Sequence, residues 1–486
     1  MKTTVISLVF AILALNAFAG QCVRFKNPKT IYKNTESTLV TGVELTDSAT
    51  IITMLYKSNS KDSTWIKIPS GTCLSDENAT MHKLKDAIGI GVDSITWIPK
   101  HGELEFSLIF GPLPKGTNVF DYIEGNPSED AFRIIGIHDD KAGYDLSKFK
   151  QKTANQANAP ECVYSRDTTY VYGKIHGYSP DWGCDSIYSF YRGLLNDINN
   201  KKDAGYSSVA IQGDGSFVLK LVIDAPSWSY FRAGKWKGTE IHFFAFPGDK
   251  LHIEIDDFQS ENRKVSYRSE KGNPTYENLM KATAYLPVIY YNPWKHAKLS
   301  DGEFMSIAKK FREEQITTIN YLIAKFALSS FESRMLWNRA ALNYGSALFF
   351  HASTLEDPRK EHGTDAAGKG NCKFYPTNYT FLKDMPLDDD YTIFDQTNFT
   401  FFMERLSASF MTFNALHEYN EDKTWLQRLE RLPSLRFGHE NNGKVLFTTQ
   451  VLMLYNAQCA NDATKAVFAK YITTPYLKEL FNKIVK

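Results

Sequence analysis

The sequence predicts a multidomain α+β protein in which two antiparallel β-sandwich domains precede an all-α helical domain. Up to about residue 260, short runs alternate apolar and polar residues, and this period of two indicates strands. From about Asn273 onward the apolar residues recur with the 3.6-residue period of helices. A length of 486 residues, with 43% hydrophobic and 23% charged side chains, suits a globular chain of several domains.

Residues 1–19 have the pattern of a signal peptide. Lys2 precedes an apolar stretch from Val5 to Leu15, and the small residues Ala17 and Ala19 then form a signal-peptidase site. We therefore expect export, with cleavage after Ala19, to the periplasm or outer cell envelope. The apolar stretch is shorter than the roughly 20 residues that span a bilayer, and no later stretch approaches that length uninterrupted, so no membrane span is predicted.

Residues 20–140 are predicted to form the first β-sandwich. Strand-like alternation occurs at Ala49–Tyr56, Leu104–Leu108 and Phe132–Ile137. Turn-forming residues such as Pro69–Gly71 separate the runs at the short intervals that are typical of an antiparallel sandwich.

Residues 141–160 are polar and contain few large apolar side chains, which predicts a linker. A second, small β-sandwich is then expected over residues 161–260. Its strand-like runs are Tyr170–Ile175, Ser216–Ile223 and Ile241–Phe246.

Residues 270–486 are predicted to form the helical domain. Asp301 marks the start of one helix and Thr474-Pro475 the start of the last. Two sets of apolar residues each share a helical face: Phe304, Ile307, Phe311, Ile319, Leu322, Ile323 and Phe326, and later Phe399, Phe402, Met403, Leu406, Phe410 and Phe413.

The charge balance argues against nucleic acid as a partner. Lys and Arg total 56 and Asp and Glu total 55, so the net charge is +1. A chain without excess positive charge has no overall field to attract a phosphate backbone.

Six cysteines are the candidates for disulfides, because export to an oxidising compartment favours them. If each region folds on its own core, its two cysteines can meet only within it. That scheme pairs Cys22 with Cys73, Cys162 with Cys184 and Cys372 with Cys459. Buried free thiols are the alternative, which the sequence leaves open.

No pattern of residues supplies a catalytic, cofactor-binding or metal site. The sequence contains no H-E-x-x-H, H-x-H or G-x-S-x-G motif. Gly363–Gly370 resembles a phosphate-binding loop, but Gly370 replaces the Ser or Thr that would hold magnesium, and no apolar strand leads into it. We therefore predict no cofactor, no metal and no catalytic constellation.

Three aromatic residues that lie close in sequence are candidates for facing a ligand. Trp228, Tyr230 and Trp236 could form a platform on which sugar rings stack. Packing in a core or on a sheet face is the alternative interpretation.

Several segments resemble the N-terminal region of exported TlpA-type thiol:disulfide reductases of Gram-negative anaerobes. In order along the chain they are Trp65–Ser70, Gly102–Phe106, Pro112–Thr117, Phe120–Gly125 and Phe132–Ile137. Pro247–Ile255 is similar to the closing strand of the small β domain that follows in that family, and Phe381–Asp388 to part of its helical region.

In that family a thioredoxin domain with a C-x-x-C motif follows the helical region, and this sequence contains no C-x-x-C. The family's active-site residues therefore have no counterpart here. The resemblance implies a non-catalytic envelope protein that binds a partner or ligand. One alternative is a redox protein whose thioredoxin domain is supplied separately or lost. A third hypothesis, a glycan-binding accessory protein, rests on the aromatic content and the two sandwich domains.

Overall fold

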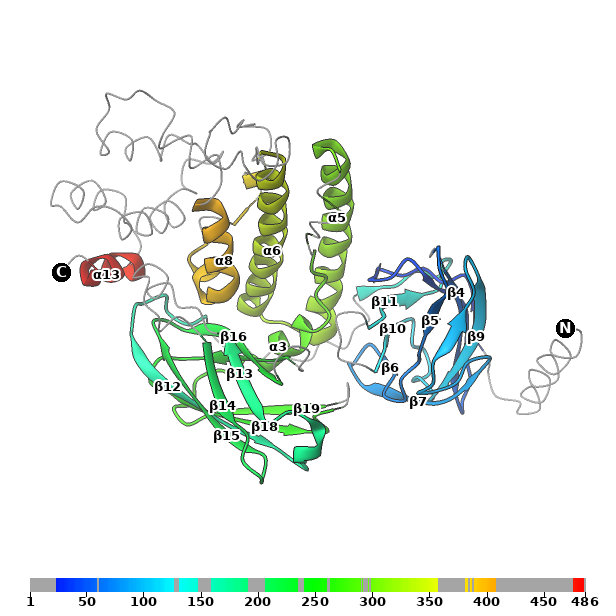
Figure 1. Cartoon of the computed structure of the whole chain (residues 1–486), viewed down its shortest axis with the longest axis horizontal. Coiled ribbons are helices and arrows are strands. Elements are labelled where there is room, and N and C mark those ends of the chain that lie inside the picture. The colour runs from blue at the N-terminus through cyan, green and yellow to red at the C-terminus, as the bar shows by residue number, and fades with distance from the viewer. Residues whose placement is uncertain are drawn as a thin grey trace, which may run out of the picture. The chain divides into compact units, whose positions relative to one another are not determined.

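A computed structural model gives the fold of the chain (Figure 1). The residues it describes are 23–58, 61–125, 131–146, 159–190, 206–234, 240–259, 263–289, 291, 296, 299–356, 381–382, 385–386, 389–407 and 475–484. The predicted signal peptide and most of the predicted linker lie outside these residues. β-rich regions are followed by helices, which confirms the predicted α+β class.

Contacts within the chain define two compact units. Unit 1 comprises residues 1–150 with 260–262, and unit 2 comprises residues 151–259 with 263–486. The boundary at residue 150 falls inside the segment predicted as a linker. Unit 2 contains both the second β region and the helices, whereas two separate domains were predicted from the sequence for these regions.

Unit 1 is built from one large antiparallel sheet and a small ribbon. Its strands are β1 (Val23–Lys26), β2 (Tyr32–Lys33), β3 (Thr38–Leu45), β4 (Thr50–Lys57), β5 (Thr64–Ile66), β6 (Cys73–Ser75), β7 (Met81–Ile88), β8 (Thr96–Ile98), β9 (Glu103–Phe110), β10 (Val119–Ile123) and β11 (Arg133–His138). Nine of them form a sheet in the order β1-β3-β4-β9-β7-β6-β10-β11-β2, and β5 pairs only with β8.

A single core lies inside this nine-stranded sheet. Ile52 of β4 and Phe106 of β9 come from one half of the sheet, and Tyr122 of β10 and Ile134 of β11 come from the other half. All four belong to the same buried cluster, so the sheet folds over on itself and its two halves face each other as the layers of a sandwich would.

A β-bulge in β11 depends on a glycine. The pairing of β10 with β11 shifts register between Phe120 and Tyr122, and the residue between them, Asp121, is fully buried. Its carboxylate accepts a hydrogen bond of 2.8 Å from the Gly136 N–H. Gly136 has a φ of 66°, and a Cβ atom there would lie 2.4 Å from the Cδ1 atom of Ile31.

Replacing Gly136 by alanine is expected to destabilise unit 1 by about 2–4 kcal/mol, because left-handed backbone strain adds to overpacking. Gly143→Ala is the matched control, since Gly143 has a φ of 63° but no atom within 4 Å of its Cβ position. The control should lose only about 1 kcal/mol. Chemical denaturation measures both variants, and equal losses would contradict the steric argument.

Unit 2 begins with a β-sandwich. Its strands are β12 (Asp167–Ile175), β13 (Ser186–Phe190), β14 (Tyr206–Ala210), β15 (Ser216–Ile223), β16 (Ser227–Ala233), β17 (Glu240–Ala245), β18 (Lys250–Asp256) and β19 (Lys264–Ser269), with a 3-10 helix, η3 (Pro180–Trp182), after β12. They form two sheets, ordered β15-β12-β18-β19 and β14-β13-β16-β17, over a shared core. The β12 and β18 strands are parallel, which departs from the purely antiparallel prediction.

Helices follow the sandwich in unit 2. They are α3 (Glu277–Thr283), α5 (Asp301–Phe326), α6 (Ser330–Glu356), the 3-10 helix η6 (Asp390–Phe394), α8 (Gln396–Ser407) and α13 (Pro475–Ile484). The predicted starts at Asp301 and Pro475 are confirmed. The Ser300 side chain caps α5 by accepting a hydrogen bond from the Glu303 N–H. In turn, the Glu303 carboxylate accepts a 2.8 Å hydrogen bond from the Ser300 N–H.

The helices cover one sheet of the sandwich. Every described residue of β16 is buried or half-buried, whereas β15 strictly alternates buried residues with more exposed ones. Phe244 of β17 contacts Phe331 of α6 and Phe394 of η6 with ring centroids 6.1 and 6.2 Å apart. The second β region and the helices therefore share an apolar interface and form one compact unit.

Candidate functional site

The candidate ligand-facing aromatics occupy the interface between the covered sheet and the helices. Trp228 is 1% exposed, and the guanidinium of Arg339 lies 4.1 Å from its ring centroid. Tyr230 is half-buried beside His242, at 5.4 Å between centroids. Trp236 lies outside the described residues. Trp228 therefore packs between a sheet and helices and is not a ligand surface, which corrects the hypothesis for this residue.

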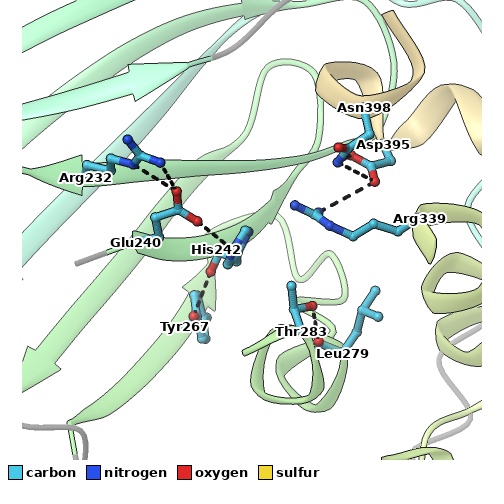
Figure 2. Close-up of polar contacts among 9 residues, drawn as sticks. All are labelled: Arg232, Glu240, His242, Tyr267, Leu279, Thr283, Arg339, Asp395 and Asn398. Atoms are coloured by element: carbon cyan, nitrogen blue, oxygen red, sulfur yellow. Dashed lines mark hydrogen bonds and ion pairs between the residues drawn. The ribbon is translucent and has the colours of Figure 1, made fainter. Parts of the chain in front are cut away.

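Figure 2 shows a polar network on β16 and β17, and β16 also carries Trp228 and Tyr230. Arg232 Nε donates a 2.8 Å hydrogen bond to Glu240 Oε1, and His242 Nε2 lies 3.5 Å from Glu240 Oε2. Burial tends to raise the pKa of Glu240, but the hydrogen bonds and positive charges of His242 and Arg232 outweigh it and lower this pKa to about 2. Burial lowers the pKa of His242, and the hydrogen bond with Glu240 only partly opposes this shift.

An ion pair joins the helices above the same sheet (Figure 2). Arg339 of α6 lies 3.6 Å from Asp395, whose side chain is 1% exposed, and Asn398 donates hydrogen bonds of 2.9 and 3.0 Å to the two oxygens of that carboxylate. Arg339 thus links α6 both to Asp395 and to the Trp228 ring of β16, while the Nδ1 atom of His242 is buried without a hydrogen-bond partner among the described residues. The network is therefore a structural joint between the sheet and the helices.

The two cysteines that were predicted to pair in unit 2 are both free thiols. The Cys162 sulfur lies 3.7 Å from the carbonyl oxygen of Asp390, while Cys184 lies beside Gly234. The predicted Cys162–Cys184 disulfide is therefore not formed, because Cys162 is held against the helical region and Cys184 stays within the sandwich. The other proposed pairs stay predictions, since Cys22, Cys372 and Cys459 lie outside the described residues.

We expect the thiol of Cys162 to react slowly in the folded protein. Burial, together with the charges of Asp390 and Asp389, raises its pKa from 9.0 to about 12. Its thiolate fraction at neutral pH is then roughly a thousandfold lower than that of an ordinary thiol. Alkylation by iodoacetamide, followed by peptide mass spectrometry, should be much slower in the native chain than in urea. Equal rates in the two conditions would contradict this expectation.

The described residues contain neither a helix that could span a membrane nor a cluster of metal-binding side chains. None of the helices there is both long and apolar enough to span a membrane. No group of three or more His, Cys, Asp or Glu side chains in those ranges is placed to hold a metal ion.

Two tryptophans that the structure describes as exposed form a surface on the small ribbon of unit 1. Trp65 of β5 and Trp97 of β8 are 53% and 66% exposed, and they are direct cross-strand partners. Such partners project from the same face of a ribbon with Cβ atoms about 5 Å apart. Ile95, two residues before Trp97, is 54% exposed. We call Trp65, Trp97 and Ile95 the indole face.

The opposite side of the ribbon anchors it to the core. Ile66 and Ile98 are each 2% exposed and belong to the buried cluster of unit 1. Beyond the strands, Ile68 forms a bridge with Val92, and the Asp93 N–H donates to the Ile68 carbonyl at 2.9 Å. The buried side of the ribbon and this bridge fix its backbone, so the two indoles are presented to solvent from a rigid support.

Polar groups of both charges surround the indole face. Lys67, Asp93 and Ser94 are exposed at one end of the ribbon, and Lys61 and Lys100 are exposed beyond the other. Hydrogen bonds from Ser70 and the charge of Lys67 lower the pKa of Asp93. The rim therefore offers an ionised carboxylate, ammonium groups and a hydroxyl beside two apolar rings.

A second row of rings lies on the uncovered sheet of unit 2. Tyr172 stacks on His252 with centroids 5.2 Å apart, and Tyr170 stacks on Tyr172 at 6.3 Å. His252 Nε2 is 2.9 Å from the Glu270 carboxylate. These rings are half-buried and pack on one another, so they offer less free ring surface than the indole face.

Trp65 and Trp97 were not predicted to be site residues from the sequence. Both fall in runs where apolar residues are adjacent, Trp65-Ile66 and Trp97-Ile98, so either member of each pair could face the core. Only the cross-strand register shows that both tryptophans share the outer side. The repeated Trp-Ile dipeptide in two short strand-like runs was the only sequence feature that could have indicated this face.

Comparison with known proteins adds no assignment for this site. No protein-family model matches the chain, and no curated protein is significantly similar to it.

Proposed function

We propose that the chain is an exported, non-catalytic binding protein of the cell envelope that engages its ligand or partner through the indole face. The observation that carries this proposal is the direct pairing of Trp65 and Trp97, which are 53% and 66% exposed on a rigid ribbon. The predicted signal peptide and the resemblance to accessory modules of exported reductases support the compartment.

Exposed indoles are costly in an unliganded protein, which favours a binding role for this face. Burying a large aromatic side chain contributes about 1.5–3 kcal/mol to the stability of a folded protein. Trp65 and Trp97 contribute less than this because more than half of each side chain stays exposed. Aromatic residues on rigid supports lose little conformational entropy on binding, and they dominate the energetics of interfaces.

Oxidative footprinting in the native envelope tests the proposal without knowledge of the ligand. Hydroxyl radicals should oxidise Trp65 and Trp97 readily in the purified chain and much less in the intact envelope fraction. Trp182, which is half-buried against Phe258 with ring planes 8° apart, is the internal control and should react equally in both samples. Equal oxidation of the two indoles in both samples would reject the proposal.

The intact mass of the protein from the same envelope fraction tests the predicted signal peptide. It should correspond to a mature chain that starts at Gly20.

The redox alternative is tested separately. Burial is the main cause that raises the pKa of both Cys162 and Cys184. Raised thiol pKa values disfavour the nucleophilic thiolate that disulfide exchange needs. We expect the purified chain not to reduce insulin disulfides in the presence of dithiothreitol above the uncatalysed rate. Turnover that is abolished by replacing any single cysteine with serine would replace the binding proposal with a redox function.

A further inference from the structure

We propose that the indole face binds carbohydrate, with sugar rings stacked on Trp65 and Trp97. This inference rests on the proposed function and names the chemical class of the ligand. A pyranose ring presents an apolar C–H face and a periphery of hydroxyl groups. The C–H face complements the negative face of an indole, and the hydroxyls complement a polar rim.

The size of the indole face favours a small ligand over a folded protein. At 53% and 66% exposure, the two indoles together expose roughly 300 Å². A stable protein interface needs about 800 Å² from each partner. Exposed charged residues at both ends of the ribbon limit the apolar area, so the face is too small to be the core of a dimer.

The charges around the face favour a ligand that is neutral overall. Attachment to an anionic bilayer needs an excess of basic residues near the inserted aromatic side chains. Around this face Lys61, Lys67 and Lys100 are accompanied by Asp62 and Asp93, so three positive charges against two negative ones leave an excess of one. Clusters that bind anionic lipids contain roughly four or more basic residues. An ionised carboxylate beside the indoles repels anionic headgroups but accepts hydrogen bonds from sugar hydroxyls.

The cross-strand pairing favours an oligosaccharide over a single sugar. Trp65 and Trp97 are direct partners and project from one side of the ribbon. Two indoles on the same side of the ribbon can each carry one sugar unit of a chain, and the ligand then gains affinity from both stacking contacts at once. Ile95, which directly precedes β8, adds a further exposed apolar side chain two residues before Trp97.

Titration with neutral hexasaccharides tests the inference. Cellohexaose, maltohexaose, chitohexaose and mannohexaose are added to the full mature chain while tryptophan emission and heat are recorded. We expect at least one of them to bind, and Trp65→Ala or Trp97→Ala to weaken that binding roughly tenfold or more. Trp182→Phe and Tyr172→Ala are the controls. Both should bind as the wild type does.

Each other result has a distinct meaning. Absence of binding by all four sugars overturns the carbohydrate assignment, and vesicles of phosphatidylethanolamine and phosphatidylglycerol then test a membrane surface with the same two variants. Loss of sugar binding on Tyr172→Ala instead would move the site to unit 2 and also overturn it. The footprint of Trp65 and Trp97 in the envelope is independent of these titrations, so the binding proposal fails only if that footprint is missing.

Discussion

Replacing Asp395 by alanine is expected to destabilise unit 2 by about 3–5 kcal/mol, because it leaves the charge of Arg339 buried without its counter-ion. The Asp395 side chain is 1% exposed and that of Arg339 is 14% exposed. Asn398 would also lose the acceptor of its two hydrogen bonds. Denaturant unfolding gives the change in free energy. Hydrogen exchange should localise the loss of protection to β16, α6 and α8.

Two further variants separate the ion pair from a general loss of packing. Glu314→Ala removes an exposed pair with Lys310 in the same unit, at 3.9 Å, and should change stability by no more than about 0.5 kcal/mol. Arg339→Met combined with Asp395→Ala should cost less than Asp395→Ala alone, because no unpaired charge remains. A double variant that is less stable than both single variants would contradict this account.

Replacing Glu124 by glutamine is expected to stabilise unit 1 above about pH 7. Burial raises the pKa of Glu124 from 4.5 to about 7, and the hydrogen bond that Phe132 N–H donates to its carboxylate only partly opposes the shift. The folded state therefore prefers the protonated carboxyl. Its contribution to stability is fully present below about pH 4.5 and is lost as the pH rises through about 7.

The shift corresponds to roughly 3 kcal/mol of stability between the two ends of this pH range. Glutamine resembles the protonated side chain at every pH, so the difference between variant and wild type should grow from near zero at about pH 4.5 to that value at about pH 8. Comparing the two proteins at each pH cancels the titration of other groups. Glu103→Gln is the matched control, because Glu103 is exposed beside Lys57 and its replacement should change stability by no more than about 0.5 kcal/mol. A difference for Glu124→Gln that does not grow with pH would refute the buried-carboxyl argument.

Local patterns in the sequence were sufficient to predict several of the strands and the starts of two helices. The alternation at Ser216–Ile223 corresponds to β15, whose side chains alternate between the core and the outside along its whole length. The predicted helix starts at Asp301 and Pro475 are the observed first residues of α5 and α13. These features depend on neighbours along the chain, which is the information that a period of 2 or 3.6 contains.

Longer-range features were not accessible in the same way. The parallel pairing of β12 with β18 joins strands that are about 80 residues apart, and no local pattern specifies it. Trp228 was a candidate for a ligand-binding platform because it lies close in sequence to Tyr230 and Trp236. The helices α6 and α8 bury it, and they lie more than 100 residues later in the chain.

The sequence by itself determined the α+β class, the order of β regions before helices, and the absence of C-x-x-C chemistry from the chain. Only the tertiary structure decided which side of each element meets solvent. It places Trp65 and Trp97 outside and Ile66 and Ile98 inside, and it holds Cys162 away from Cys184. Burial is a property of the packed molecule, because a side chain is removed from water by residues far away in sequence. The candidate binding face could therefore be recognised only once the register of β5 and β8 was known.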